Sequence, residues 1–196
     1  MTQPNIVMTN PVMDFLLTRR SRPAAALKTP APEGEALELL LTAAARVPDH
    51  GALMPWRFLI PEAPARQRLA DLIRTRGPVL GVDPVKAEKS AALWEKAPLI
   101  VAVISSPVPS DKAPELEQVL SSGAVCVSLV NAALALGWGA AWITGWAAFD
   151  RVFVEQGLGL SAHEQVAGFV ILGTCDTPVS DRPRPHLSKL ITRVPE

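Results

Sequence analysis

Three short clusters of cationic and aromatic residues are the parts of this chain best suited to chemistry. Two arginines and a serine follow one another at residues 19–21, where a short helix is expected to end. Arginine suits a doubly charged phosphate, because its planar guanidinium donates paired, charge-assisted hydrogen bonds. A second cluster begins at Arg46 and ends at His50, and an apolar run with Trp56 and Phe58 follows it.

A phosphate-binding cluster beside an apolar run suits flavin mononucleotide (FMN), which joins a phosphate to a flat ring system. Each feature also has a structural explanation. Arginines at a helix end interact favourably with the negative end of the helix dipole, and a tryptophan that begins a strand is commonly part of the core. The order of the clusters along the chain favours the binding interpretation.

The composition limits the classes of protein to which the chain can belong. It has 196 residues, of which 48% are hydrophobic and 19% charged, with a formal net charge of zero. This length predicts one domain with a sizeable core. The zero net charge argues against nucleic acid or an anionic membrane as the main partner, because both bind basic surfaces. The low charge also indicates that a second subunit covers part of the surface.

The sequence predicts a cytoplasmic protein with no membrane partner. Cys126 and Cys175 lie in apolar contexts without the spacing of metal ligands, so we expect reduced, buried thiols and no metal site. The first twelve residues have neither the basic start nor the apolar run of a signal peptide. We expect no apolar stretch to be both long enough and free of polar groups to span a bilayer. Residues 1–10 are expected to form a flexible tail.

Apolar periodicity divides the chain into the elements that must position these clusters. Helices are expected at about residues 11–20, 33–46, 63–76, 85–96, 115–136 and 149–155, and strands at about 56–61, 99–104, 140–143 and 166–173. The run at 99–104 is continuously apolar, which predicts burial on both faces. The pattern is α+β, a small central sheet with helices on both faces, in one domain over residues 11–196. Its Pro-rich end, from about residue 177, is expected to be an arm.

The longest expected helix, at 115–136, is apolar over nearly its whole circumference. A helix of this kind is surrounded by protein. Its small residues Ser121-Ser122-Gly123-Ala124 would let another helix approach closely. We therefore expect this helix to meet its own copy across the axis of a homodimer.

With these elements placed, the chain resembles the nitroreductase family over about residues 13–190, in particular its compact, single-domain, FMN-dependent branch. The resemblance rests on motifs in a specific order, namely Arg19-Arg20-Ser21, Arg46-Val47-Pro48-Asp49-His50, Met54-Pro55-Trp56-Arg57-Phe58, Ala97-Pro98-Leu99-Ile100-Val101, Ala135 to Gly145 and Gly168 to Thr174. It implies a mostly antiparallel central sheet, a long helix at a dimer interface, and FMN bound between two copies of the chain.

The resemblance also implies which residues bind FMN. The phosphate end would contact Arg19, Arg20 and Ser21, and Arg46 and His50 would make further contacts with the flavin.

Two further segments belong to the implied site. The backbone of Trp142-Ile143-Thr144-Gly145 would lie along the isoalloxazine ring, and residues 52–56, with Met54 and Trp56, would face the partner's flavin. Arg184 is the first choice for a C-terminal phosphate contact and Arg182 the second.

The chain departs from the larger family members in two respects, at their C-terminal phosphate-binding basic residues and at a lysine. They carry a lysine close after the Arg-x-Ser motif, near the pyrimidine edge of the flavin, where this chain has Arg22-Pro23-Ala24-Ala25-Ala26.

The implied activity moves hydride from NAD(P)H to FMN, and then electrons to a nitroaromatic, a quinone or a similar small-molecule acceptor. The flavin carries this chemistry, so no catalytic side chain is expected. The protein must hold the ring and place positive potential near N1 and O2, where charge grows on reduction. A flavin-binding or sensing protein without turnover would use the same residues. Hydrolysis by Asp49, His50 and a serine is a weaker alternative, because adjacent Asp and His do not by themselves make a relay.

Overall fold

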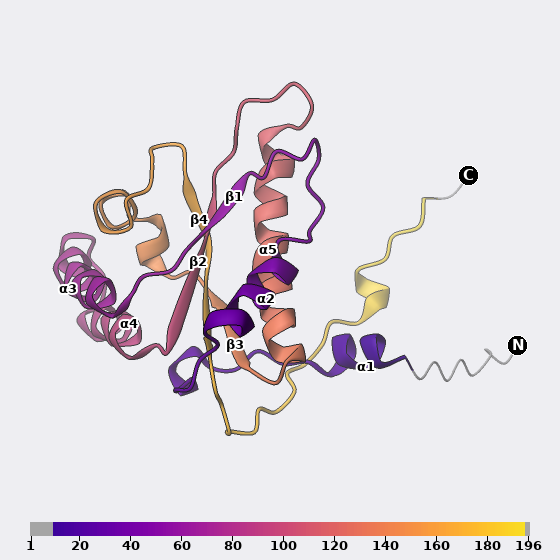
Figure 1. Cartoon of the computed structure of the whole chain (residues 1–196), viewed down its shortest axis with the longest axis horizontal. Helices are drawn as coiled ribbons and strands as arrows, with labels where there is room; N and C mark the ends of the chain where they lie inside the picture. Colours follow the sequence, from indigo (N-terminus) through magenta and orange to yellow (C-terminus); the bar gives the residue numbers. More distant parts are fainter. Residues whose placement is uncertain (1–9, 195–196) are drawn as a thin grey trace, which may run out of the picture.

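The computed structural model describes residues 10–194, so all but the last residue of the expected 1–10 tail lies outside the described part of the chain. One four-stranded sheet, in the order β1-β2-β4-β3, forms the centre of the molecule, with helices on both faces (Figure 1). The strands are β1 (Trp56–Leu59), β2 (Leu99–Ser105), β3 (Gly139–Ile143) and β4 (Gln165–Gly173). Each adjacent pair is antiparallel, which confirms the expected α+β class.

The described residues form five α-helices, four of which cover the sheet (Figure 1). They are α1 (Pro11–Thr18), α2 (Gly34–Ala44), α3 (Ala63–Val79), α4 (Pro84–Lys96) and α5 (Glu115–Ala135). Helices α2 and α5 cover one face, and α3 and α4 cover the other (Figure 1). The described residues also form three short 3-10 turns and one π turn. The 3-10 turns are η1 (Ala24–Ala26), η2 (Trp146–Phe149) and η4 (Leu187–Lys189), and the π turn is η3 (Phe153–Gly157).

The expected helix at 149–155 is wrong in its bounds, because two helical segments meet there, η2 and a segment over residues 151–157 that contains η3. The first turn, η2, ends at Phe149. The carboxylate of Asp150 then accepts a hydrogen bond from the Phe153 amide at 3.2 Å and starts a new turn. The same carboxylate accepts from Nε and Nη2 of the Arg76 guanidinium, at 2.8 and 2.9 Å. Asp150 thereby fixes this segment against α3.

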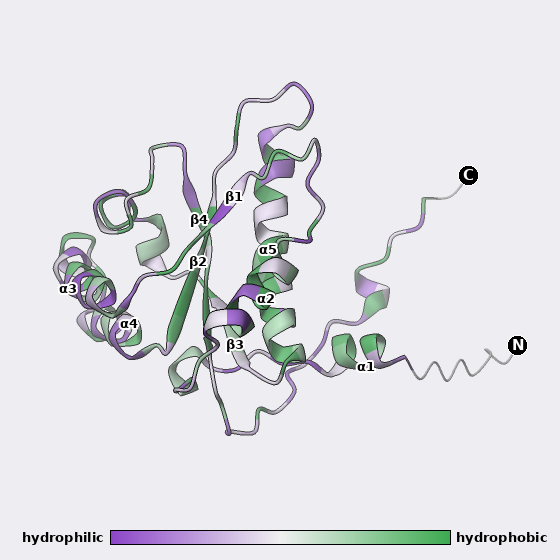
Figure 2. Cartoon of the chain, in the orientation of Figure 1, coloured by the Kyte–Doolittle hydropathy of each residue, from purple (hydrophilic) through white to green (hydrophobic). Residues whose placement is uncertain are grey.

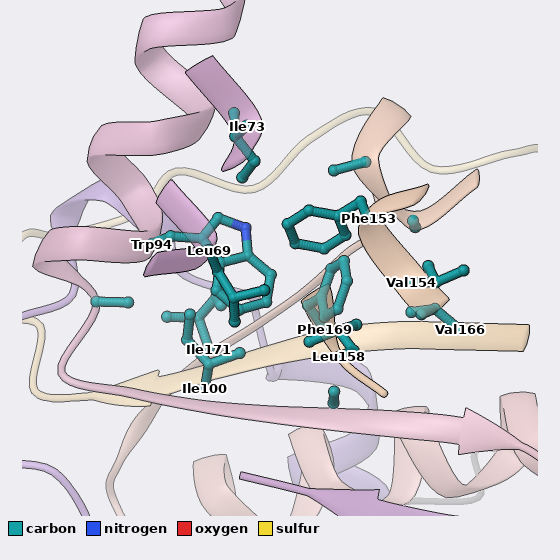
Figure 3. Packing of buried hydrophobic residues seen from close by; sticks show 14 of the residues in the cluster. Leu69, Ile73, Trp94, Ile100, Phe153, Val154, Leu158, Val166, Phe169 and Ile171 are labelled. Atoms are coloured by element: carbon teal, nitrogen blue, oxygen red, sulfur yellow. The ribbon is translucent and has the colours of Figure 1, made fainter. Parts of the chain in front are cut away.

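Strand β2 is buried along its whole length, as its continuous apolar run predicts. One set of its side chains joins a core under α3 and α4, and the other joins a core under α2 and α5. The first core is centred on Trp94, whose ring meets Phe153 and Phe169 edge-on, with centroids 5.4 and 5.0 Å apart (Figure 3). The sheet is therefore held from both sides, and only its edges are open.

Helix α5 buries one side and exposes the other. Ser122, Val125 and Leu129 are buried completely, whereas Leu116 and Leu120 are 69% and 64% exposed. The expectation of burial all round is therefore not met within one chain. By length and composition α5 could also cross a membrane, so the sequence-based expectation that no stretch qualifies was wrong. It packs against the sheet, and 44% of its most apolar window is buried.

An ion pair ties β1 to the segment that precedes β4. The Arg57 guanidinium donates to both oxygens of the buried Glu164 carboxylate, at 2.7 and 2.9 Å. These hydrogen bonds lower the pKa of Glu164 to about 2. Because its pKa is lower in the folded state, the pair stabilises the protein above about pH 4.5, and this contribution is lost as the pH falls towards 2.

We expect Glu164→Gln to lower the free energy of unfolding at pH 7 by about 2 kcal/mol, which is typical of a hydrogen bond to a charged group. It should also flatten the loss of stability between pH 4.5 and pH 2. Urea unfolding across this pH range measures both effects. Glu155→Gln is the control, since Glu155 pairs with Arg151 on the surface, where such pairs contribute less than about 1 kcal/mol. Equal effects of the two variants would contradict the assignment.

Candidate functional site

The arginines at residues 19 and 20 lie in a cavity formed by both ends of the described chain. Its volume is about 250 Å³, and its walls are Arg19, Arg20, Ser21, Val179, Ser180, Asp181, Arg182 and Arg184. We call it the arginine pocket. One wall is the segment that leaves α1, and the other is the C-terminal arm. The structure therefore brings together Arg19, Arg20, Ser21 and Arg184, and it adds the second choice, Arg182.

The arginine pocket is strongly positive, with four guanidiniums against one carboxylate. Asp181 binds Arg184 at 2.7 Å and Arg20 at 3.3 Å. The hydrogen bond from Arg184 is the main reason that the pKa of Asp181 is lowered. Asp181 thus holds two of the cations at the pocket, a role that sequence reasoning missed. The local sequence Asp181-Arg182-Pro183-Arg184 does not indicate that Asp181 also contacts Arg20, which lies near the other end of the chain.

Two donors in the arginine pocket have no acceptor. The Nε atoms of Arg19 and Arg20 are buried and make no hydrogen bond to any residue that the structure describes. Arg19 does donate from Nη2 to Ser21 Oγ at 3.2 Å. Buried donors without partners are rare in native proteins and point to a missing acceptor. An anion with several oxygens, such as a phosphate group, fits this set of donors.

The segment after the arginines runs along the open edge of the sheet. Strand β3 pairs only with β4, so its other edge is free. The Arg22 amide donates to the Ala140 carbonyl on that edge at 2.8 Å. Farther along β3, Ile143 packs into the core and Gly145 turns the chain with a φ of 76°. An edge strand leaves backbone groups unpaired, so the segment from Trp142 to Gly145 could bind a polar ring edge.

The ring of Trp142 lies on the α5 side of the sheet. A Cβ atom at Gly168 would overlap its indole, so the glycine provides the space for the ring. The indole nitrogen donates to the Ala167 carbonyl at 3.3 Å, and the residue remains 42% exposed. The backbone of Trp142 therefore belongs to the open edge of β3, while its side chain covers β4.

The other predicted site residues lie outside the arginine pocket, beside the first half of α5. His50 Nδ1 is 2.7 Å from the Glu117 carboxylate. Trp56 Nε1 donates to Ser121 Oγ at 3.1 Å, and Trp56 packs against the core under α5. Arg46 is exposed just after α2. Within one chain, the predicted residues therefore form three groups: those of the arginine pocket, the 142–145 segment at the end of β3, and those beside α5.

The loop before β1 is held in a strained conformation. Ala52 and Met54 have φ angles of 52° and 48°, which is uncommon for residues other than glycine. The Asp49 carboxylate accepts from the amides of Leu53 and Met54, at 3.1 and 2.8 Å. The Met54 side chain is left 70% exposed. Strain of this kind is typical of binding segments, and it supports a functional role for the loop.

Asp49 was not among the predicted site residues. Its signal is weak but present, since an aspartate in a loop commonly hydrogen-bonds amides that follow it. Asp49 binds backbone amides while His50 faces Glu117, so the two are not arranged as a hydrolytic relay.

We expect Asp49→Ala to loosen the loop, because the amides of Leu53 and of the positive-φ residue Met54 lose the carboxylate that accepts from them. Two lost hydrogen bonds correspond to about 1–2 kcal/mol, so amide exchange at Leu53 and Met54 should accelerate roughly tenfold. Hydrogen exchange followed by mass spectrometry or NMR measures this. His50→Gln removes the neighbouring contact with Glu117 and should leave both amides protected. Unchanged exchange in Asp49→Ala would show that the backbone alone holds the loop.

Comparison with known proteins identifies relatives along most of the chain. The sequence pattern of the nitroreductase family matches residues 16–174. YdjA of Escherichia coli strain K12, named provisionally as an NAD(P)H nitroreductase, is 33% identical over 162 residues, which cover 83% of this chain and 87% of YdjA. A Haemophilus influenzae protein with the same provisional name is 32% identical over 164 residues, covering 83% of this chain and 87% of that protein.

Solved structures of related proteins have the same fold. A nitroreductase-like family protein from Bacillus cereus superposes with a TM-score of 0.78 at 19% identity, over 99% of this chain and 98% of that one. A protein from Desulfovibrio desulfuricans, described provisionally as a nitroreductase and solved in complex with FMN, has a TM-score of 0.71 at 25% identity, over 95% and 98% of the two chains. The NADPH:FMN oxidoreductase of Vibrio harveyi, solved with NAD+, has a TM-score of 0.72 at 18% identity, over 94% and 76%.

Proposed function

Because this chain belongs to the nitroreductase family of oxidoreductases, we propose that it binds FMN and transfers electrons from NAD(P)H to a small-molecule acceptor such as a nitroaromatic or a quinone. The observation that carries the proposal is the arginine pocket, with its four guanidiniums and two buried donors that lack an acceptor. The FMN bound to the Desulfovibrio desulfuricans relative supports the choice of cofactor.

The residues of the arginine pocket would hold the phosphate of FMN. Arg19 and Arg20 would donate their free Nε groups to it, and Ser21 and Arg184 would bind it from either side of the pocket. Asp181 would keep Arg20 and Arg184 oriented in its absence. The open edge of β3 would contact the ring through backbone groups. Bound FMN would supply the redox chemistry, and hydride transfer to it needs no acid or base from the protein.

Three apolar surfaces support a homodimer as the working form, which we place in the cytoplasm on the sequence evidence. Helix α1 lies beyond α5, away from the sheet, and none of its residues is buried (Figure 1). Yet it is apolar, as is the exposed side of α5, and the C-terminal arm exposes Leu187, Leu190 and Ile191 (Figure 2). A helix of eight residues is marginal in water unless something packs on it. A second copy would cover these surfaces and bring its strained loop towards the cofactor.

We expect the purified protein to be yellow and to bleach when NADH or NADPH is added without oxygen. Arg19→Ala should weaken FMN binding by about 1.5–3 kcal/mol, or about 10- to 150-fold, the range for a charge-assisted hydrogen bond. Fluorescence titration measures the affinity. Arg68→Ala is the control, since Arg68 contacts the Gly157 carbonyl on the α3 side of the sheet. A colourless protein that does not take up FMN would refute the proposal, and bound FMN that neither nucleotide bleaches would favour a binding protein without turnover.

Leu120→Glu should convert the dimer to monomers, because it places a charge on the exposed apolar side of α5. The substitution removes one Leu120 side chain from each side of the interface, which weakens the free energy of association by more than about 3 kcal/mol. The dissociation constant of the dimer should therefore rise at least about a hundredfold. Analytical ultracentrifugation gives the mass. Val79→Glu, an exposed site at the end of α3, should leave the mass unchanged. A wild-type protein that sediments as a monomer would exclude the dimer.

A further inference from the structure

A second cavity, of about 410 Å³, lies between η1 and α4. We call it the lysine cavity. Its walls are apolar apart from two lysines, and they consist of Ala24, Ala25, Leu27, Lys89, Ala92, Leu93, Lys96 and Ala97. Such a cavity suits a flat apolar ligand that carries negative charge on one edge.

One chain segment lines both the arginine pocket and the lysine cavity. Ser21 lines the pocket, and Ala24, three residues later, lines the cavity. Between them, the hydrogen bond from the Arg22 amide to the Ala140 carbonyl keeps the chain on the open edge of β3. A ligand whose phosphate lies in the arginine pocket can therefore reach the cavity along this edge.

Lys89 lies nearer than Lys96 to the predicted ring-binding segment at 142–145. A Cβ atom at Gly77 would touch the side chains of Ala87 and Trp146, so the N-terminal part of α4 lies where the chain leaves β3. The other end of α4 lies near the start of β3, because Leu27, which lines the cavity, also touches Gly139. Helix α4 thus presents Lys89 towards the end of β3 at which the 142–145 segment turns.

The two lysines of the lysine cavity form no ion pair with the described residues. Within the described chain, neither Lys89 nor Lys96 has an acidic group within ion-pair distance. The two acids of α4 that could neutralise them, Glu88 and Glu95, both bind Arg74 of α3, at 2.9 and 2.6 Å. The charge of Lys96 still contributes to lowering the pKa of both carboxylates, so its own charge is partly compensated.

We propose that Lys89 places its positive charge beside the pyrimidine edge of the flavin, and this inference rests on the proposed function. Reduction by two electrons puts negative charge near N1 and O2, and a fixed ammonium there stabilises the reduced ring more than the oxidised one. Ala24 and Ala25 leave the cavity open for the ring edge and supply no cation from η1. The cation therefore comes from α4, across the cavity.

The test compares the affinities of Lys89→Gln for oxidised and reduced FMN. Oxidised FMN should bind within about threefold of wild type, because the arginine pocket is intact. Reduced FMN should bind about tenfold more weakly relative to oxidised FMN, which for two electrons lowers the midpoint potential by about 30 mV. Spectroelectrochemical titration of the FMN-loaded protein measures the potential, and Lys89→Arg should restore it.

Two lysines on the same helix provide matched controls. Lys86→Gln and Lys96→Gln should leave the midpoint potential close to that of wild type, since Lys86 does not line the cavity and Lys96 lies at its far end. An unchanged potential in Lys89→Gln, or a larger shift in Lys96→Gln, would overturn the assignment while the FMN proposal stands. A wild-type protein without FMN would instead refute the proposed function itself.

Discussion

The open edge of β3 is the constraint on which the candidate site depends. Strand β3 is short, with five residues, and it pairs only with β4. One hydrogen bond, from the Arg22 amide to the Ala140 carbonyl, attaches the segment after α1 to this edge. That attachment positions one wall of each cavity, because residues just before Arg22 line the arginine pocket and residues just after it line the lysine cavity. The rest of the edge stays free for a ligand, whereas in most sheets an unpaired edge must be protected.

The second constraint is that one chain leaves several apolar surfaces uncovered. The segment that leaves α1 and the C-terminal arm form the arginine pocket, yet neither α1 nor the arm packs on the core of its own chain. Their positions would be well defined only if another surface supported them, and the exposed side of α5 is apolar. A second copy of the chain would account for both the uncovered apolar surfaces and the position of the arginine pocket. The partner that covers α1 would also fix the guanidiniums of Arg19 and Arg20. Cofactor binding and association would then be coupled thermodynamically.

Much of the fold could be predicted from the sequence, because its apolar periodicity is strong. The buried strand at 99–104 and the long helix at 115–136 differ from β2 and α5 by one residue at one end. The turn at Asp150 could not be predicted, since it depends on an ion pair with Arg76, 74 residues away. The same holds for the site. The arginine motif predicts the Arg19–Ser21 cluster, but the local sequence does not indicate that Asp181 contacts this cluster. It also does not indicate that Lys89 and Ala24 line the same cavity. Pairings set by tertiary packing leave no periodic signal.

The two groups of cations would contribute differently to the function. Phosphate carries its charge in both redox states, so the arginine pocket would bind oxidised and reduced FMN equally and would set affinity alone. Interactions that do not change during a reaction cannot alter its energetics. The ring gains charge only on reduction, so a cation beside it acts on the difference between the two states. Placing four arginines at one end and a lysine at the other would therefore allow affinity and redox potential to be adjusted independently. The hydrogen-bonded segment from Ser21 to Ala24 keeps the two groups apart on one edge of the sheet.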